Sequence, residues 1–192
     1  MNDKLQDSCG WPGSEPIYIK YHDLEWGVPE RDSRALWEKL ILDGFQAGLS
    51  WLTILKKRSA FREAFDGFDP NIVATYQAED VERLLQNAKI VRHRGKIEAT
   101  IGNARAWQAI EAEMGFDQFL WRYMDGEPLQ NRFLSHDDIP ASTDLSLRIS
   151  KDLKAAGFKF CGPTIVYAFM QAVGMVNDHL ISCPRHAEVK RL

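Results

Sequence analysis

The chain is organised around the stretch Leu42-Asp43-Gly44-Phe45-Gln46-Ala47-Gly48-Leu49-Ser50-Trp51. In it, the carboxylate of Asp43 and the ring of Trp51 flank a turn broken by two glycines, between two amphipathic helices. A carboxylate among apolar and aromatic neighbours suits the binding of a flat polar ring, and glycine lets backbone approach a ligand closely. On its own such a pattern is more often a helix cap and a core tryptophan. We interpret the stretch as the candidate wall of a pocket.

Length and composition are those of a globular protein. The 192 residues, 45% of them hydrophobic, suffice for one substantial domain or two small ones with a shared core. No apolar run approaches the roughly 20 residues that span a bilayer, and the polar start Met1-Asn2-Asp3-Lys4 lacks the features of a signal peptide. The three cysteines cannot all pair in disulfides. We therefore expect a cytoplasmic protein with no membrane partner, whose thiols bind metal or pack in the core.

The charges are unevenly distributed along the chain. The net charge of −3 argues against non-specific binding of nucleic acid over the whole surface, but it permits local basic faces. One basic cluster is Lys56-Lys57-Arg58, and another consists of Lys89, Arg92, Arg94 and Lys96. The second cluster coincides with the start of an expected helix, where each exposed positive charge costs about 0.3 to 1 kcal/mol. An anionic partner there would compensate, although a solvated surface of mixed charge explains the same pattern.

Periodicity and capping residues predict an all-α fold. Residues 1–30 contain frequent glycines and prolines and are expected to be irregular. Ser33, Ser50 and Asp69-Pro70 are candidate helix starts. The expected helices cover residues 33–44, 51–57, 80–85, 92–114, 116–123, 142–156 and 163–173, with short ones at 61–65 and after 70. We expect a single unit with a helical core at 33–175 and terminal segments at 1–30 and 176–192.

The segment Gly157-Phe158-Lys159-Phe160-Cys161-Gly162-Pro163-Thr164 has the composition of a helix-hairpin-helix motif, placed at about residues 143–173. Gly157 can take the left-handed cap, the two phenylalanines can anchor the turn in the core, and Gly162-Pro163 can begin the second helix. The free amides at that helix start make a ready phosphate site. An ordinary turn between two helices explains the same residues about as well.

Two pairs of metal-binding side chains lie near the two ends of the chain. They are Cys9 with His22 and His179 with Cys183, enough for a closed tetrahedral zinc site. A His-x-x-x-Cys spacing alone is usually a helical coincidence, but a metal clip would explain how irregular terminal segments become ordered. Four protein ligands leave no open position for water, so this zinc would be structural, which disfavours a zinc hydrolase. The spare candidates are His93, His136, His186 and Cys161, the last of which better suits the core.

Five motifs follow one another between the first and the last of these ligands. They are Cys9-Gly10-Trp11, Tyr18-Ile19-Lys20-Tyr21-His22-Asp23-Leu24-Glu25-Trp26-Gly27, Gln46-Ala47-Gly48-Leu49-Ser50-Trp51, Val91-Arg92-His93-Arg94-Gly95-Lys96-Ile97 and Val176-Asn177-Asp178-His179. In these motifs the chain resembles the 3-methyladenine DNA glycosylase I family. The resemblance implies an all-helical helix-hairpin-helix glycosylase with zinc-clipped termini. It further implies excision of 3-methyladenine from alkylated double-stranded DNA, and we expect no obligate protein partner.

The resemblance also implies roles for single residues. Asp43 would be the catalytic residue of a base pocket whose other members are Tyr21, Trp51, Trp11, Tyr18 and Trp26. The zinc ligands would be Cys9, His22, His179 and Cys183. The candidate DNA contacts are Gly48, Leu49, Lys159, Gly162 and Thr164. The best-known members carry glutamate where this chain has the shorter Asp43. Lyase chemistry is not expected, because the place of a nucleophilic lysine is taken by Ile165, Val166 and Tyr167.

This chemistry suits the residue types. A base methylated at N3 is cationic and departs as a neutral molecule, so little acid catalysis is needed. Trp51 would stack on the base with a cation–π attraction of about 0.5 to 2 kcal/mol, Asp43 would accept from its donor edge, and Tyr21 would orient it. Two alternatives remain open. One is a non-catalytic zinc-containing helix-hairpin-helix module that binds DNA, and the other is an alkyl-base glycosylase of broader specificity.

Overall fold

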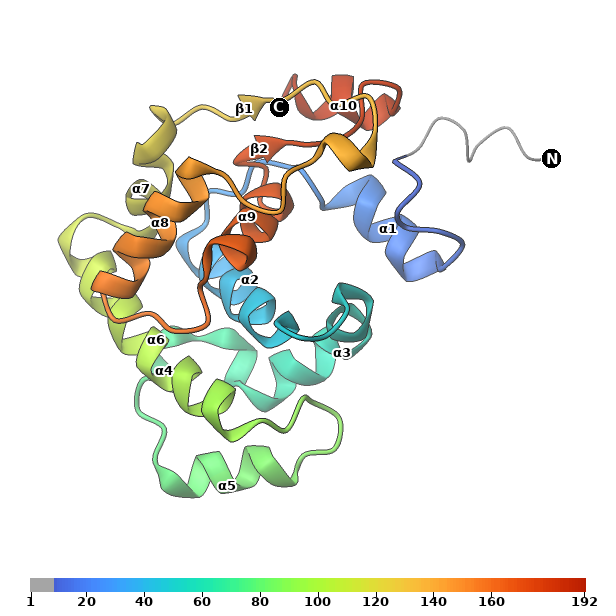
Figure 1. Ribbon diagram of the computed structural model, residues 1–192. Helices are drawn as coiled ribbons and strands as arrows, with labels where there is room; N and C mark the ends of the chain where they lie inside the picture. Colours follow the sequence, from blue (N-terminus) through green and yellow to red (C-terminus); the bar gives the residue numbers. More distant parts are fainter. Residues whose placement is uncertain (1–8) are drawn as a thin grey trace.

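The helix α2, Ser33–Gln46, runs through the middle of the molecule and contacts α3, α6, α7 and α9 (Figure 1). It begins one residue later than its cap: Asp32 accepts a hydrogen bond from the Ala35 amide at 2.7 Å. The expected cap, Ser33, is therefore the first helical residue. From Leu36 to Phe45 the helix buries its apolar side chains, and each large one contributes about 1.5 to 3 kcal/mol by leaving water.

The computed structural model describes residues 9–192, and the predicted all-α class is confirmed there. The segment 1–8, which carries the polar start used above to argue against a signal peptide, lies outside the described residues. Besides α2, the helices are α1 Pro16–Leu24, α3 Trp51–Ala64, α4 Pro70–Val73, α5 Ala78–Gln86, α6 Arg94–Glu113, α7 Phe116–Trp121, α8 Asp144–Ala155, α9 Pro163–Ala172 and α10 Pro184–Val189. Short 3-10 turns lie at η1 Asp66–Phe68, η2 Arg122–Met124 and η3 His136–Asp138. Two-residue strands, β1 Leu129–Gln130 and β2 Val176–Asn177, pair in parallel, a pairing that the sequence did not indicate.

Several predicted boundaries were wrong. The expected irregular segment 1–30 contains α1, which begins at Pro16 because proline suits the first helical position. The helix after Ser50 continues to Ala64, so it includes residues 61–64 of the expected separate helix at 61–65, and Phe65 is its C-cap. The cap of α8 is Thr143, whose side chain accepts from the Ser146 amide at 3.2 Å. In contrast, Ser50 and Asp69 are N-caps as predicted.

The turn between α2 and α3 lies further along the chain than predicted. Gly44 is helical and buried, and a Cβ atom there would lie 3.3 Å from Phe160 of the hairpin. This glycine therefore allows close packing and does not break the helix. Gly48 has a φ of +81°, so it is the glycine that the turn requires.

The segment between α8 and α9 is a tight hairpin whose two helices pack on each other. Gly157 has a φ of +101°, and Gly162 and Pro163 are the cap and the first residue of α9, as predicted. Phe158 is buried, but the expected anchor Phe160 is 39% exposed. The backbone of Phe160 is left-handed, with a φ of +55°.

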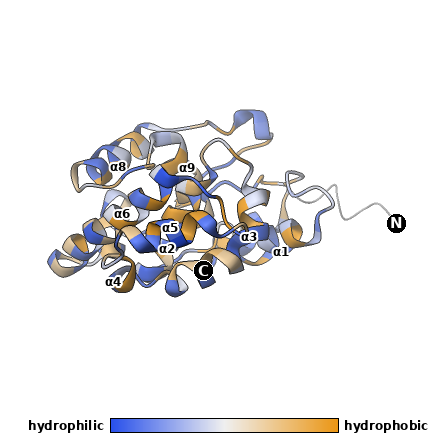
Figure 2. Ribbon diagram, turned by 90° about the horizontal axis from the view of Figure 1, so that it is seen from below, coloured by the Kyte–Doolittle hydropathy of each residue, from blue (hydrophilic) through white to orange (hydrophobic). Residues whose placement is uncertain are grey.

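Two apolar clusters hold these elements together. The larger one fills the space around α2, α6 and α9, and the smaller one joins residues near both ends of the described chain, including Cys9, Tyr21, Trp26 and Cys183. Most helices carry polar and apolar residues together, as expected for helices that bury one face (Figure 2). Among residues 9–192, no helix combines the length and the apolar character needed to cross a membrane.

Candidate active site and metal centre

A cavity of about 410 Å³ opens between α1, α2, α3 and α9. The structure places on its walls all six side chains that the sequence assigned to a base pocket: Trp11, Tyr18, Tyr21, Trp26, Asp43 and Trp51. They come from four separate parts of the chain, and the helices bring them to one place. Their roles toward a base remain predictions, but the cavity exists where those roles require it.

Aromatic rings form one side of this cavity. The Trp11 ring packs edge-on against Tyr18 at 4.7 Å and against Trp26 at 5.2 Å between ring centres. Tyr21 and Trp51 lie 5.4 Å apart with a tilt of 47° between their planes. Rings that support one another in this way lose little entropy on binding, so the wall is preorganised for a flat ligand.

The Asp43 carboxylate is the acceptor of the cavity. The residue is 3% exposed, and its Oδ1 atom lies 2.5 Å from Lys39 Nζ. Burial raises the pKa of the carboxyl group, and the charge of Lys39 and its hydrogen bond act in the opposite direction. The Oδ2 atom is buried and has no hydrogen-bond partner within the described part of the chain, so its capacity to accept a hydrogen bond is unused.

Lys39 is a lining residue that the sequence reasoning missed. Its Nζ atom lies 3.8 Å from the centre of the Trp51 ring as well as against Asp43. The signal was present, because a lysine and an aspartate four residues apart on a helix share one face. Tyr167 and Gln171 also line the cavity, and both donate to the buried carboxylate of Asp178, at 2.7 and 2.8 Å. Nothing in their spacing alone would have indicated this.

The candidate DNA contacts fall into two groups. Gly48 and Leu49 form the exposed turn after α2, where Gln46 Nε2 donates to the Leu49 carbonyl oxygen at 2.7 Å. Lys159, Gly162 and Thr164 belong to the hairpin, and of these only Thr164 also lines the cavity among the described residues.

Packing and hydrogen bonds fix the hairpin beside that turn. The Asn103 side chain pairs with the backbone of Lys159, accepting from its amide at 2.8 Å and donating to its carbonyl at 3.1 Å. Phe160 packs on Gly44 in the last turns of α2, so the hairpin lies close to the end of that helix.

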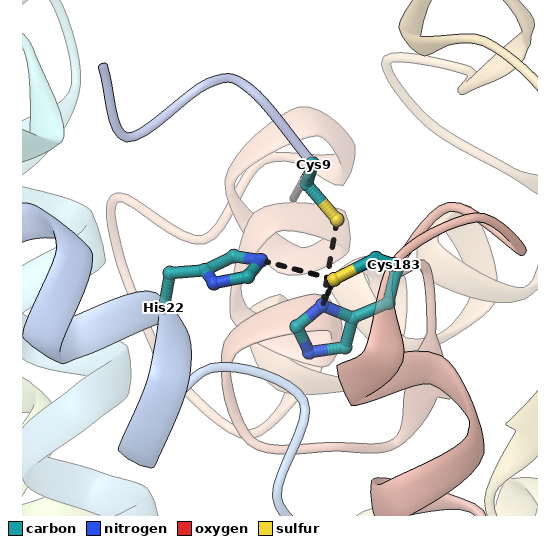
Figure 3. Close-up of side chains that lie close together, drawn as sticks. Cys9, His22 and Cys183 are labelled. Atoms are coloured by element: carbon teal, nitrogen blue, oxygen red, sulfur yellow. Dashed lines mark hydrogen bonds between the residues drawn. The ribbon is translucent and has the colours of Figure 1, made fainter. Parts of the chain in front are cut away.

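The four predicted metal ligands converge at one buried point. One donor atom from each of Cys9, His22, His179 and Cys183 lies within 4.8 Å of every other (Figure 3). Cys9 Sγ is 3.5 Å from His179 Nδ1, and Cys183 Sγ is 3.8 Å from both His179 Nδ1 and His22 Nε2. A tetrahedral zinc with bonds of about 2.0 to 2.3 Å would hold such atoms about 3.3 to 3.8 Å apart. The donor set and its spacing therefore fit a metal ion.

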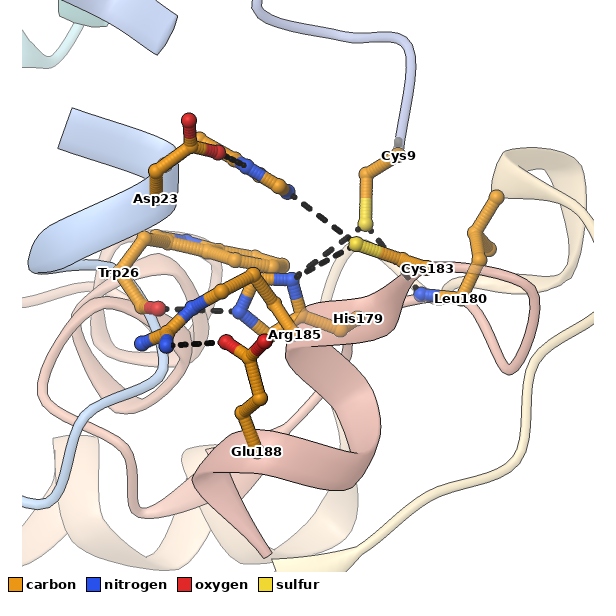
Figure 4. A network of polar contacts seen from close by, with 9 residues as sticks. Cys9, Asp23, Trp26, His179, Leu180, Cys183, Arg185 and Glu188 are labelled. Carbon is orange, nitrogen blue, oxygen red and sulfur yellow. Dashed lines mark hydrogen bonds and ion pairs between the residues drawn. The ribbon is translucent and has the colours of Figure 1, made fainter. Parts of the chain in front are cut away.

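The remaining imidazole nitrogens of this cluster are also bonded (Figure 4). His22 Nδ1 lies 2.8 Å from Asp23 Oδ1, and His179 Nε2 lies 3.0 Å from the Trp26 carbonyl oxygen. Such outer partners fix the ring orientation of metal-binding histidines. A hydrogen bond between the two thiols is the main cause that lowers the pKa of Cys183 and raises the pKa of Cys9, so the pair favours a thiolate at Cys183.

The spare metal candidates lie outside this cluster. Cys161 is buried in the core, as suggested, and Ser150 donates to its carbonyl oxygen at 2.6 Å. His136 contacts the Cys9 carbonyl oxygen, and His186 contacts that of Asn131 at 2.8 Å.

Residues of the metal cluster are sequence neighbours of residues that line the cavity. Trp11 follows Cys9 by two positions, Tyr21 precedes His22, and the carbonyl group of the lining residue Trp26 bonds His179. A metal at the cluster would therefore hold the aromatic wall in place.

The fold and this cavity define a helical protein with a cavity lined by aromatic rings and a buried carboxylate. Over residues 11–186 the chain matches the methyladenine glycosylase family, and it belongs to that family. It is 53% identical to DNA-3-methyladenine glycosylase 1 of Escherichia coli (strain K12), over 92% of this chain and 95% of that one.

Solved structures show the same likeness. A crystal structure of 3-methyladenine DNA glycosylase I has a TM-score of 0.91 at 55% identity, over 92% of this chain and 98% of that one. A structure on 3-methyladenine recognition by the Staphylococcus aureus enzyme has a TM-score of 0.91 at 42% identity, over 94% and 96%. The predicted family is thereby confirmed.

Proposed function

We propose that this chain is a monofunctional DNA glycosylase that flips out 3-methyladenine from alkylated double-stranded DNA and hydrolyses its N-glycosidic bond. The observation that carries this proposal is the cavity, whose lining combines aromatic rings with Asp43, a buried carboxylate that has one oxygen without a partner among residues 9–192. Family membership supports the same substrate, because the relatives are named for 3-methyladenine.

The pocket residues divide the work of holding the base. The Trp51 ring stacks on the base, and the Tyr21 ring packs against the Trp51 ring. Asp43 Oδ2 accepts a hydrogen bond from the donor edge of the base. A base that lacks this donor leaves a buried carboxylate oxygen unpaired, which costs about 1 to 3 kcal/mol or more. The electron pair of the broken bond leaves with the base, which needs little help because it becomes neutral.

The DNA backbone and the gap in the duplex are handled by the two exposed segments. The start of α9 behind Gly162 offers amides to a phosphate, with Lys159 and Thr164 beside it, as a helix-hairpin-helix motif does. Leu49, 41% exposed at the tip of its turn, is the apolar wedge that fills the space of the flipped base. The first turn of α9 carries Ile165, Val166 and Tyr167, so it has no lysine to support lyase chemistry.

A structural zinc holds the two ends of the chain together. Its ligands are Cys9, His22, His179 and Cys183, and it joins the described residues of segment 1–30 and the segment 176–192 to the helical core at 33–175 as one unit. Because all four positions are taken by protein, the zinc supplies stability and does not activate water.

The test is release of base from methylated DNA. Duplex DNA treated with a methylating agent is incubated with the chain, and released bases are separated and identified. We expect free 3-methyladenine, with 7-methylguanine and hypoxanthine retained in panel substrates. Binding without release would indicate the non-catalytic module, and release of several bases would indicate the broader specificity.

A further inference from the structure

The ammonium group of Lys39 lies inside the proposed base pocket. Its Nζ atom is 2.5 Å from Asp43 Oδ1 and 3.8 Å from the centre of the Trp51 ring. The side chain is only 14% exposed, so this charge is largely withdrawn from water. The pocket thus already contains a cation at the two groups that are proposed to receive the base.

A cation in this position competes with a cationic ligand. The face of a tryptophan and a buried carboxylate are the two features of the pocket that attract positive charge. Lys39 contacts both, so a cationic base on Trp51 would meet a like charge at short range in a site with little screening. A neutral base of the same shape meets no such repulsion.

We propose that Lys39 is a specificity-determining residue for the charge of the bound base, because its ammonium group lies against both Asp43 and Trp51 and therefore repels a cationic base on that ring more than a neutral one. This inference rests on the proposed function. It concerns a residue that lines the proposed base pocket, and this residue sets how strongly the pocket prefers the neutral base over the cationic base.

The alternative positions for the ammonium group are already taken. Lys39 also lines a neighbouring cavity of about 260 Å³, whose carboxylates are Glu25, Glu30 and Glu38. Glu30 Oε1 accepts from two backbone amides at 2.8 Å. Glu25 pairs with Arg58, and Glu38 pairs with Arg62 at 2.7 Å. If a cationic base displaced the ammonium group, Lys39 would lose its partner Asp43 and find only carboxylates that already have partners. This loss opposes binding of a cationic base.

Bond cleavage changes the charge that Lys39 meets. In the DNA the N3-methylated base is cationic. When the bond from base nitrogen to deoxyribose carbon breaks, its electron pair stays on the base, which becomes neutral, and the sugar carbon carries the positive charge until water adds. Lys39 therefore disfavours the bound substrate more than the state in which the bond is breaking. Such a difference raises kcat and KM together.

The experiment compares two forms of one ring. The probes are neutral 3-methyladenine and an adenine methylated at both N3 and N9, which stays cationic at neutral pH, and calorimetry gives Kd for each. For Lys39→Met we expect the cationic probe to bind about tenfold tighter or more, while the neutral probe changes by less than about threefold. In Lys39→Arg, the ratio of the Kd values for the cationic and the neutral probe should be the same as in the unchanged chain. With methylated DNA, Lys39→Met should lower kcat and KM together.

The matched control is Lys56→Met, which removes an exposed lysine that pairs with Glu15 at 3.0 Å. It should change neither Kd. An unchanged ratio of the two Kd values in Lys39→Met would overturn the inference, and Lys39→Gln gives the same reading if the methionine variant does not fold. Base release by the unchanged chain is measured alongside. If the unchanged chain releases the base but the ratio of the two Kd values is unaltered in Lys39→Met, only the role of Lys39 is rejected. If the unchanged chain neither releases the base nor binds the probes, the proposed function is rejected and this inference with it.

Discussion

At the scale of single residues, the main question is how Asp43 reaches a base. Its side chain is one methylene shorter than the glutamate that the family resemblance leads us to expect at this position, and Lys39 engages one of its two oxygens. The other oxygen remains without a partner among the described residues. One free oxygen suffices for a hydrogen bond from the base, so the ion pair with Lys39 does not use up the acceptors of Asp43.

Asp43→Asn tests that use. The amide is close in size but carries no charge, so we expect kcat/KM for 3-methyladenine release to fall by about tenfold to a hundredfold, as when a hydrogen bond to a charged group is lost. The matched control is Glu38→Gln on the same helix, whose carboxylate pairs with Arg62 outside the cavity. Unchanged release by Asp43→Asn would remove the residue from the mechanism.

Leu49→Ala tests the wedge. Holding a nucleotide out of the stack costs a few kcal/mol, and without the wedge less of that cost is offset, so excision from duplex DNA should fall by roughly tenfold. Binding of free 3-methyladenine should stay the same, because Leu49 lies outside the cavity lining. Leu134→Ala, at a position 74% exposed, is the control. Full excision by Leu49→Ala would mean that another residue fills the gap.

At the scale of elements, the end of α2 is fixed by a lysine from another helix. Lys96 is buried, and its Nζ atom donates to the carbonyl oxygens of Phe45 at 2.8 Å and Ala47 at 2.6 Å. These are carbonyl groups that the helix leaves without internal partners. Part of the basic cluster at the start of α6 thus serves α2, and Arg94 of the same turn pairs with Glu82. The hydrogen bonds of Lys96 thus fix the start of the turn that carries Leu49.

Lys96→Met should lower the free energy of unfolding by about 1 to 3 kcal/mol, because buried carbonyl groups lose a charged donor. The measurement is urea unfolding followed by circular dichroism. Arg94→Met removes an exposed ion pair and should change stability by less than about 1 kcal/mol. Equal stability of the two variants would show that water replaces the ammonium group at the end of α2.

At the scale of the whole molecule, the metal cluster ties together segments that are 170 positions apart, as between Cys9 and His179. Several of its residues are neighbours of pocket residues, and the Trp26 carbonyl group bonds one ligand directly. Loss of the clip should therefore affect both stability and the aromatic wall.

Cys183→Ser tests the clip. We expect one zinc per chain in the unaltered protein and a large loss of zinc in the variant, with a fall in Tm of several degrees or more. Cys161→Ser is the control, because that buried thiol lies outside the cluster and its loss should leave the zinc content unchanged. Zinc content that stays the same in Cys183→Ser would mean that another side chain completes the site.

Local signals in the sequence determined much of the secondary structure and the residue types of the site. Caps such as Ser50 and Asp69 act within three residues, so they can be read without the fold. The same holds for the left-handed Gly157 and for the pairs of metal-binding side chains. The motifs around them sufficed to predict the family, now confirmed.

Only the tertiary structure decided which side chains share a space. It brought Lys39 onto the face of Trp51, made Gly44 a packing position against Phe160 and assigned Lys96 to the end of another helix. The cavity is built from helices distant in sequence, and charge and burial within it depend on their packing. A local pattern carries no information about such contacts. Only the folded chain therefore showed that the ammonium group of Lys39 lies against both Asp43 and Trp51, two residues of the stretch Leu42–Trp51.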